Sequence, residues 1–225
     1  MAGTWESQNK VIPGAYINLL TNTPLSITAG DRGTVVIAQE LSVGTDDEIY
    51  EITATDAAYP NNATAADKKL AGLALLGAKK VLLYKLPTSH ADEHLEAMLA
   101  ALKTVDFDVL VYPYAKSSTG ASTAQQTIAT WIKSMQDDEG KNVTAVLPNY
   151  AADSEYIINS VQGVTLSDGS SLTAYETAAW IGGIAAGASI TKSNTAHKFV
   201  GAIDVTPRMT RSEQETAIKA GKFLP

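Results

Sequence analysis

Residues 64–86 read TAADKKLAGLALLGAKKVLLYKL, and this stretch decides the fold class. It predicts a helix over about Ala65–Leu76 that ends at Gly77, because glycine is common just after a helical C-terminus. The run KVLLYKL then predicts a strand over Lys80–Leu86. The stretch is therefore one helix–strand unit, and similar units follow it along the chain.

The alternation of helix and strand continues towards the C-terminus. Helices near 91–103 and 123–137 lead to the apolar runs DVLVYPY at 108–114 and NVTAVLP at 142–148. The sequence then predicts a hairpin at Ser167–Gly169, a small-residue helix near Ala174–Ala188, a strand over Lys198–Val205 and a helix over about Arg211–Lys219. The strands are continuously apolar, as expected when helices cover both faces of a parallel sheet. We therefore predict an α/β fold, with a three-layer, mostly parallel core domain over residues 61–225.

Four of the helices are expected to begin with a capping box. In this motif a Ser or Thr and an acid or Gln three residues later bond each other's backbone N–H groups. The pairs are Ser89 with Asp92, Ser122 with Gln125, Thr173 with Glu176, and Thr210 with Glu213.

Residues 1–20 predict an extended N-terminal arm rather than a regular helix or strand. Pro13 and Gly14 interrupt the arm and form its expected hinge. Such a segment either folds back on its own domain or lies against a sheet edge of a neighbouring molecule. Residues 21–60 then predict a small β-rich segment that joins the core. The arm residues expected to make the contact between subunits are Trp5, Val11, Ile12, Tyr16, Ile17 and Leu19, with Trp5 and Tyr16 as anchors.

Composition narrows the classes of function. The net charge of -7 and the pI near 4.9 argue against a binder of duplex nucleic acid, which needs clustered Lys and Arg. The absence of cysteine excludes disulfides, thiolate metal sites and Cys nucleophiles. The N-terminus lacks the pattern of a secretory signal, and the longest apolar stretch, Ala178–Ile190, is too short to span a bilayer. We expect a soluble protein made in the cytoplasm, with no nucleic-acid partner, no membrane contact and no cofactor.

One short motif offers an enzymatic alternative. Residues 90–94, HADEH, fit the pattern H-x-x-E-H, in which two His one helical turn apart bind Zn²⁺ and the Glu activates water. Glu176 is a conceivable third ligand. A zinc-dependent hydrolase using His90, His94 and Glu176 is therefore one alternative function.

A structural explanation accounts for the same residues one by one. Asp92 belongs to a predicted capping box, and Asp92 and Glu93 both lie in a first turn where the helix dipole favours acids. The apolar stripe of this helix leaves His90 and His94 beside it, towards solvent; its members are Leu95, Leu99 and Leu102. We therefore predict no catalytic residue and no metal site.

A second alternative is a monomeric module that binds a small ligand at the carboxyl ends of the strands. The helix WIGGIAAG at 180–187 lacks the G-x-G-x-x-G order of a dinucleotide loop, so close packing of the helix on the sheet through Gly183 and Gly187 explains it better. The run STGAS at 118–122 lacks the Lys-Ser/Thr ending of a P-loop and predicts a loop and a helix cap.

Six stretches, in this order, carry a resemblance to a known family. They are GTWESQNKVIPGAYIN at 3–18, AGDRGTVVIAQELSVG at 29–44, ALLGAKKVLLYKL at 74–86, FDVLVYPY at 107–114, AYETAAWIGGIAAG at 174–187 and TRSEQETAIKAGKF at 210–223. Together they resemble the tail sheath proteins of contractile phages and of phage-derived bacteriocins, especially those of Gram-positive hosts. The likeness covers most of the chain.

The resemblance implies a structural protein with a subtilisin-like α/β topology and no protease activity. It implies subunits that polymerise helically around a tail tube and contract, in a virion or tail-like particle assembled in the host cytoplasm. The implied partners are other copies of the chain, the tail tube protein, and baseplate and tail terminator proteins. Family members usually carry a β-rich insertion where this chain passes through 86–89 into the next helix, and a C-terminal domain beyond 222–224.

Overall fold

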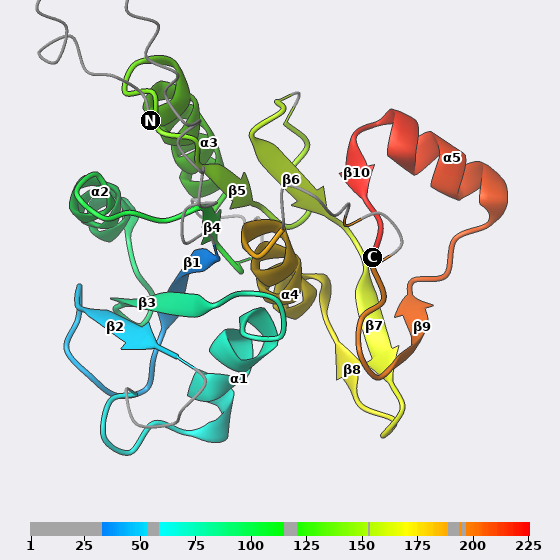
Figure 1. Ribbon diagram of the computed structural model, residues 1–225, viewed down its shortest axis with the longest axis horizontal. Helices are drawn as coiled ribbons and strands as arrows, with labels where there is room; N and C mark the ends of the chain where they lie inside the picture. Colours follow the sequence, from blue (N-terminus) through cyan, green and yellow to red (C-terminus); the bar gives the residue numbers. More distant parts are fainter. Residues whose placement is uncertain (1–32, 54–58, 115–120, 153, 189–193, 195–196) are drawn as a thin grey trace, which may run out of the picture. The chain divides into compact units, whose positions relative to one another are not determined.

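The computed structural model describes residues 33–53, 59–114, 121–152, 154–188, 194 and 197–225 (Figure 1). Its main feature is a seven-stranded sheet with the order β10-β6-β5-β4-β1-β3-β2. All neighbours in this sheet run parallel except β2 and β3. The strands are β1 (Thr34–Glu40), β2 (Ile49–Ile52), β3 (Lys80–Leu86), β4 (Val109–Val111), β5 (Thr144–Val146), β6 (Ile157–Ser160) and β10 (Lys222–Phe223). The predicted α/β class with a mostly parallel sheet is confirmed.

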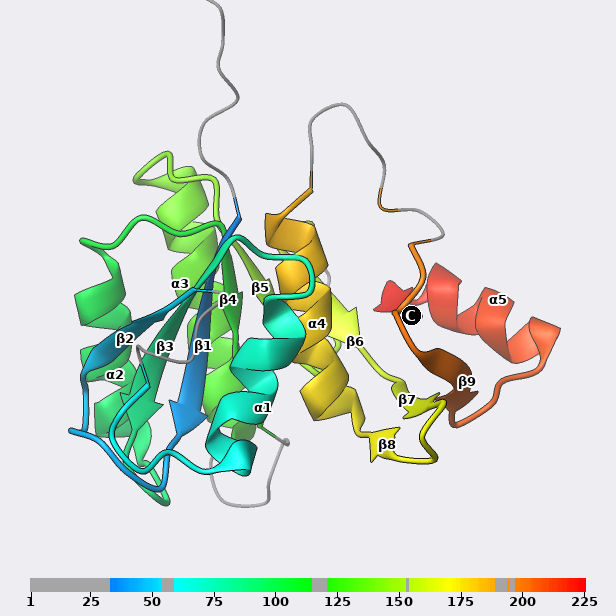
Figure 2. The ribbon, with the colours of Figure 1, turned by 60° about the horizontal axis from the view of Figure 1, so that its bottom comes forward.

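Helices cover both faces of this sheet, as the apolar strands predicted (Figure 2). On one face α2 (Asp92–Leu102) and α3 (Ala121–Asp137) pack through Leu95 and Ile128 into one core cluster. On the other face α1 (Ala65–Ala74) and α4 (Ala174–Ala186) bury Ala71 and Trp180 in a second cluster. Within the described residues, no helix is long and apolar enough to cross a membrane.

Strand β1 lies between β3 and β4 in this sheet. It pairs in parallel with both, with Val35 opposite Val81 on one side and Val109 on the other. The β-branched residues at 35–37 are fully buried, which explains why they are apolar on both faces. The segment expected to be β-rich thus supplies β1 and β2 to the main sheet, and its residues 21–32 lie outside the described part of the chain.

A smaller antiparallel sheet with the order β8-β7-β9 stands beside the main one. Its strands are β7 (Gly163–Leu166), β8 (Ser171–Leu172) and β9 (Ala202–Thr206), and α5 (Arg211–Lys219) follows β9. The hairpin predicted at Ser167–Gly169 is confirmed between β7 and β8. The strand predicted over Lys198–Val205 is wrong at its start, because Gly201 has φ +83° and interrupts the extended backbone before Ala202.

Two of the predicted capping boxes are confirmed and two are wrong. Thr173 and Thr210 cap α4 and α5 together with Glu176 and Glu213. The N-cap of α2 is Ala91, because Ser89 has φ +61° and its amide donates instead to Glu40. Helix α3 begins before Ser122, and the Nε2 group of buried Gln125 donates to the Pro148 carbonyl over 3.0 Å. A further box, Thr64 with Asp67, opens α1 and was not predicted.

The glycines of α4 pack differently from the prediction. A methyl group at Gly183 would overlap the Ala74 carbonyl of α1, and one at Gly187 would overlap the Gly77 carbonyl. These two glycines therefore allow α4 to approach the C-terminal end of α1 and not the sheet. Gly182 is the residue that faces the sheet, where an added methyl would meet the Val111 side chain.

Candidate functional site

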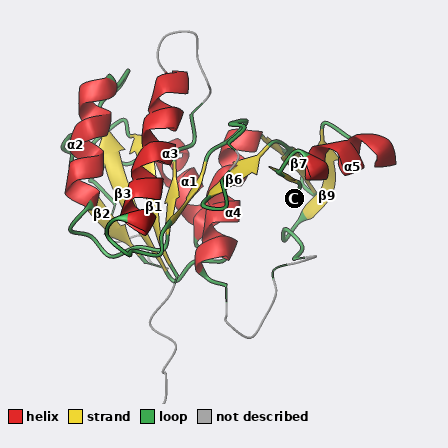
Figure 3. Cartoon of the chain, turned by 90° about the horizontal axis from the view of Figure 1, so that it is seen from above, coloured by secondary structure: helices red, strands yellow, loops and turns green. Residues whose placement is uncertain are grey.

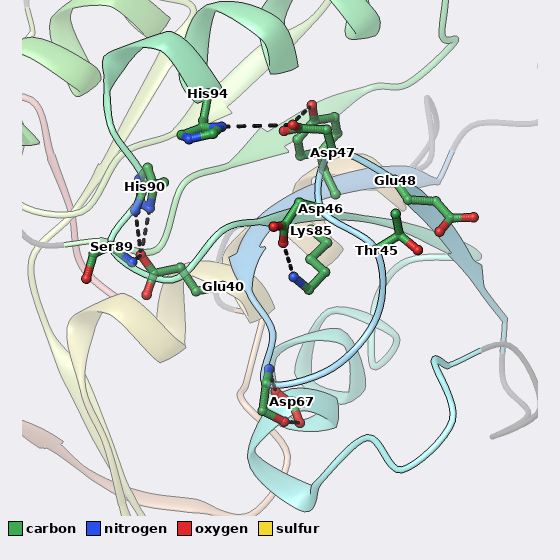
Figure 4. Close-up of polar contacts among 12 residues, drawn as sticks. Glu40, Thr45, Asp46, Asp47, Glu48, Asp67, Lys85, Ser89, His90 and His94 are labelled. Carbon is green, nitrogen blue, oxygen red and sulfur yellow. Dashed lines mark hydrogen bonds and ion pairs between the residues drawn. The ribbon is translucent and has the colours of Figure 1, made fainter.

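Polar side chains meet at the carboxyl ends of β1, β3 and β4. Because these strands are parallel neighbours, the residues that follow them come to one edge of the sheet. The Glu40 carboxylate accepts hydrogen bonds from the backbone N–H of Ser89 (2.9 Å) and of His90 (3.3 Å), and its Oε1 lies 2.8 Å from His90 Nδ1 (Figure 4). The Glu40 backbone N–H donates to the Tyr114 hydroxyl. We call Glu40, Ser89, His90, Tyr112 and Tyr114 the strand-end cluster.

The strand-end cluster joins Glu40, His90 and Tyr112 by hydrogen bonds in series. A carboxylate only accepts, so His90 Nδ1 carries the proton, and Nε2 lies 2.7 Å from the Tyr112 hydroxyl. Burial, together with the negative charges of Glu40 and Asp92, raises the pKa of Tyr112 to about 12. The Tyr112 hydroxyl therefore keeps its proton near neutral pH. The cluster therefore ties the loop between β3 and α2 to the ends of β1 and β4.

The residues of the zinc alternative are not brought together. His90 precedes α2, which begins at Asp92, so the two His do not lie on one helix. His90 was predicted to face solvent, which is wrong, since its side chain is 11% exposed and both ring nitrogens have partners. His94 Nδ1 lies 3.9 Å from Asp47 (Figure 4), and Glu176 bonds Lys69 and Thr173. No group of three His, Asp or Glu side chains in the described ranges is placed to hold a metal ion.

The acidic loop between β1 and β2 is held by bonds from neighbouring elements. Asp46 pairs with Lys85, whose side chain is only 8% exposed. The Tyr84 hydroxyl donates to Asp47 over 3.1 Å, and that of Tyr50 donates to Glu48 over 2.8 Å. These three carboxylates therefore bond side chains of the same chain and hold the loop in place.

Asp67 joins the same loop to the start of α1. Its carboxylate accepts from the backbone N–H and the hydroxyl of both Ser42 and Thr64, over 2.6–2.9 Å. Burial alone would raise the pKa of Asp67, but these hydrogen bonds outweigh it and lower the pKa to about 2. Asp67 is therefore ionised at any physiological pH and stabilises both the helix and the loop.

The C-terminal part of the chain carries a feature that the sequence did not reveal. Of the five large apolar residues exposed in the described part, all but Leu76 fall within 200–223. Val200 is 75% exposed, Ile203 68%, Ile218 63% and Phe223 36%. Val200 precedes β9, and the other three residues lie on β9, α5 and β10. The hydrophobic periodicity of β9 and α5 could not reveal this exposure. Only the elements that pack against them decide which of their side chains are covered.

Among the open grooves on the described part of the chain, one borders α5 and another lies between α2 and α3. One, of about 420 Å³, runs beside α5 and is lined by Pro207, Met209, Ala217 and Ala220 among others. The other, of about 430 Å³, is lined by Leu99 of α2 and by Gln126, Thr127, Thr130, Trp131 and Ser134 of α3. We call it the α2–α3 groove.

The predicted arm contacts lie outside the described residues. They are Trp5, Val11, Ile12, Tyr16, Ile17 and Leu19, with the expected hinge at Pro13 and Gly14. These assignments stay predictions.

Comparison with known proteins identifies the family. The model of the phage tail sheath protein central domain matches residues 90–224. The phage-like element PBSX protein XkdK of Bacillus subtilis is 37% identical over 126 residues, covering 56% of this chain and 26% of XkdK. The tail sheath protein of Clostridium phage phiCD119 is 27% identical over 184 residues, covering 79% of this chain and 49% of that protein. The chain thus spans between about a quarter and a half of these relatives.

Solved structures share the fold. The sheath tail protein of Desulfitobacterium hafniense aligns with a TM-score of 0.78 and 24% identity over 94% of this chain and 71% of that one. The contracted helical sheath of the anti-feeding prophage aligns with a TM-score of 0.59 and 15% identity over 92% of this chain and 62% of that one. The solved structures agree with the sequence comparison in fold. Because the family model matches residues 90–224, the chain belongs to the phage tail sheath protein family.

Proposed function

We propose that this protein is the structural subunit of a contractile tail sheath. It polymerises helically around a tail tube and contracts to drive the tube through a cell envelope. The match of residues 90–224 to the sheath central domain carries the proposal. The likeness to a sheath solved in its contracted state supports the contractile part of it. The protein would reside in a virion or tail-like particle assembled in the host cytoplasm.

The described residues suit a structural role. The hydrogen bonds of the strand-end cluster and of Asp67 tie loops to the α/β core, and we infer from them that the core moves as one body. Contraction requires such bodies to change their packing while flexible connections keep them linked. The N-terminal arm would supply the connection: its apolar residues would pair with a neighbouring copy, and Pro13 and Gly14 would bend as the bodies move.

The proposed partners are other copies of this chain, the tail tube protein, and baseplate and tail terminator proteins. Deleting residues 1–20 tests the arm within this scheme. We expect the shortened chain to keep a cooperative thermal unfolding transition and to lose self-association in sedimentation velocity. Self-association equal to that of the intact chain would contradict the role of the arm.

A further inference from the structure

The α2–α3 groove lies where the two helices run side by side on one face of the main sheet (Figure 3). Leu99 and Trp131 give it an apolar lining, and the hydroxyl side chains of Thr127, Thr130 and Ser134 line it as well. The indole N–H of Trp131 is buried and has no hydrogen-bond partner in the described part of the chain. A buried donor without an acceptor costs free energy. The groove therefore suits a segment that brings apolar side chains together with free backbone carbonyl groups.

The described chain begins beside this groove. The backbone N–H groups of Gly33 and Thr34, at the start of β1, donate to the Asp108 carboxylate over 2.8 and 3.0 Å. Phe107, the neighbour of Asp108 in the chain, stacks on Trp131 with 6.4 Å between the ring centroids. Figure 2 shows the start of β1, the loop after α2 and the C-terminal end of α3 at the same end of the sheet. The residues that precede Gly33 therefore enter the body next to the groove.

The sequence just before Gly33 carries side chains of the kind that the groove suits. Residues 24–29 read PLSITA and include no charged side chain. In an extended segment Leu25 and Ile27 point to the same side, and the backbone carbonyl groups stay free to accept hydrogen bonds. Residues 27–32 extend to about 20 Å, which is enough to reach from Gly33 past Phe107 to the Trp131 ring.

We propose that residues 24–27 of each copy lie in the α2–α3 groove of the same copy, with Leu25 and Ile27 as the inserted side chains. The docking itself does not depend on the sheath function, but its consequence rests on that proposed function. It fixes the root of the N-terminal arm, so that residues 1–20 leave each subunit from the α2–α3 face. The reach of the arm then falls from about 105 Å, for 32 free residues, to about 75 Å, for 23.

Pairs of introduced cysteines test the docking, because the chain has no cysteine of its own. Ile27→Cys is combined with Thr130→Cys, at an exposed position of α3 that lines the groove. The matched control combines Ile27→Cys with Gly72→Cys, at an exposed position of α1 on the other face of the sheet. The control is fair because the loop after α1 also passes the chain entry, where the Lys79 N–H donates to the Gly33 carbonyl over 2.9 Å.

Mild oxidation of the dilute variants is followed by non-reducing electrophoresis and mass spectrometry, after circular dichroism has established that each variant is folded. We expect the pair with Thr130→Cys to form a disulfide within one chain at least about tenfold faster than the pair with Gly72→Cys, because docking raises the local concentration of one thiol at the other. Adding Leu25→Asp to the groove pair removes one inserted apolar side chain and should slow the reaction to the rate of the control pair.

Three outcomes would overturn the inference. Equal rates for the two cysteine pairs, or a groove pair that Leu25→Asp does not slow, would show that residues 24–27 are tethered near the groove without docking in it. A disulfide that joins two chains would assign the groove to a neighbouring copy instead. Each of these outcomes leaves the sheath function standing, because that function is tested separately by whether the protein forms rings or tubes.

Discussion

Replacing Gly183 by Ala tests the packing of α4 against α1. An added Cβ would overlap the carbonyl oxygen of Ala74 and lie 2.9 Å from the carbonyl carbon and the Cα of that residue, closer than real Cβ atoms come to backbone. The two helices must move apart, and overpacking of this kind costs about 1–3 kcal/mol. The opposing atoms are backbone and cannot rotate away, so the upper end applies. Alanine regains roughly 1 kcal/mol of helix propensity over glycine, which leaves a net loss of about 2 kcal/mol.

Gly72→Ala is the matched control for this substitution. Gly72 is exposed on α1 and an added Cβ meets nothing within 4 Å, so only the gain in propensity remains. Thermal unfolding followed by circular dichroism measures both variants. At roughly 2–4 °C per kcal/mol for a chain of this size, we expect the melting temperature to fall by about 4–8 °C for Gly183→Ala and to rise by about 2–4 °C for Gly72→Ala. Equal shifts in the same direction would refute the packing described for α4.

Three further predictions follow from the site and the arm. Lowering the pKa of Asp67 from 3.8 to about 2 contributes roughly 2 kcal/mol of stability, which is fully present above pH 3.8 and is lost as the pH falls towards 2. Asp67→Asn should lose this stability already at pH 7. The control Glu213→Gln, in the exposed capping box of α5, should change the free energy of urea unfolding much less. His90→Ala leaves the Tyr112 hydroxyl without its ring partner and should lower the free energy of urea unfolding by about 1–3 kcal/mol. Elemental analysis should find no stoichiometric zinc before or after the change. One zinc per chain that is lost with His90 would instead support the zinc-hydrolase alternative. The chain without residues 1–20 should melt within a few degrees of the intact chain, and loss of its cooperative transition would show that the arm belongs to the core.

The sequence predicted the α/β class because the deciding signals are local. The runs at 81–84 and 109–111 are apolar on both faces, as expected of strands covered by helices on both sides. The capping boxes at Thr173 and Thr210 are local as well, since each needs only its own first turn. Such local features can be predicted from the sequence without knowing which elements pack against them.

The features that the sequence missed depend on residues far apart in the chain. His90 was expected in solvent, but Glu40, fifty positions earlier, and Tyr112 bury and bond it. Strand β9 reads like another strand of the main sheet, yet it pairs antiparallel with β7 in a second sheet. The 63% exposure of Ile218 depends on what packs against α5, which the sequence of the helix does not show. No local pattern distinguishes these outcomes.

The measurement that tests the sheath function most directly is negative-stain electron microscopy of the purified chain, alongside a version carrying any C-terminal continuation that its gene encodes. We expect rings or hollow tubes from at least one of the two. Monodisperse single particles from both would contradict the sheath function.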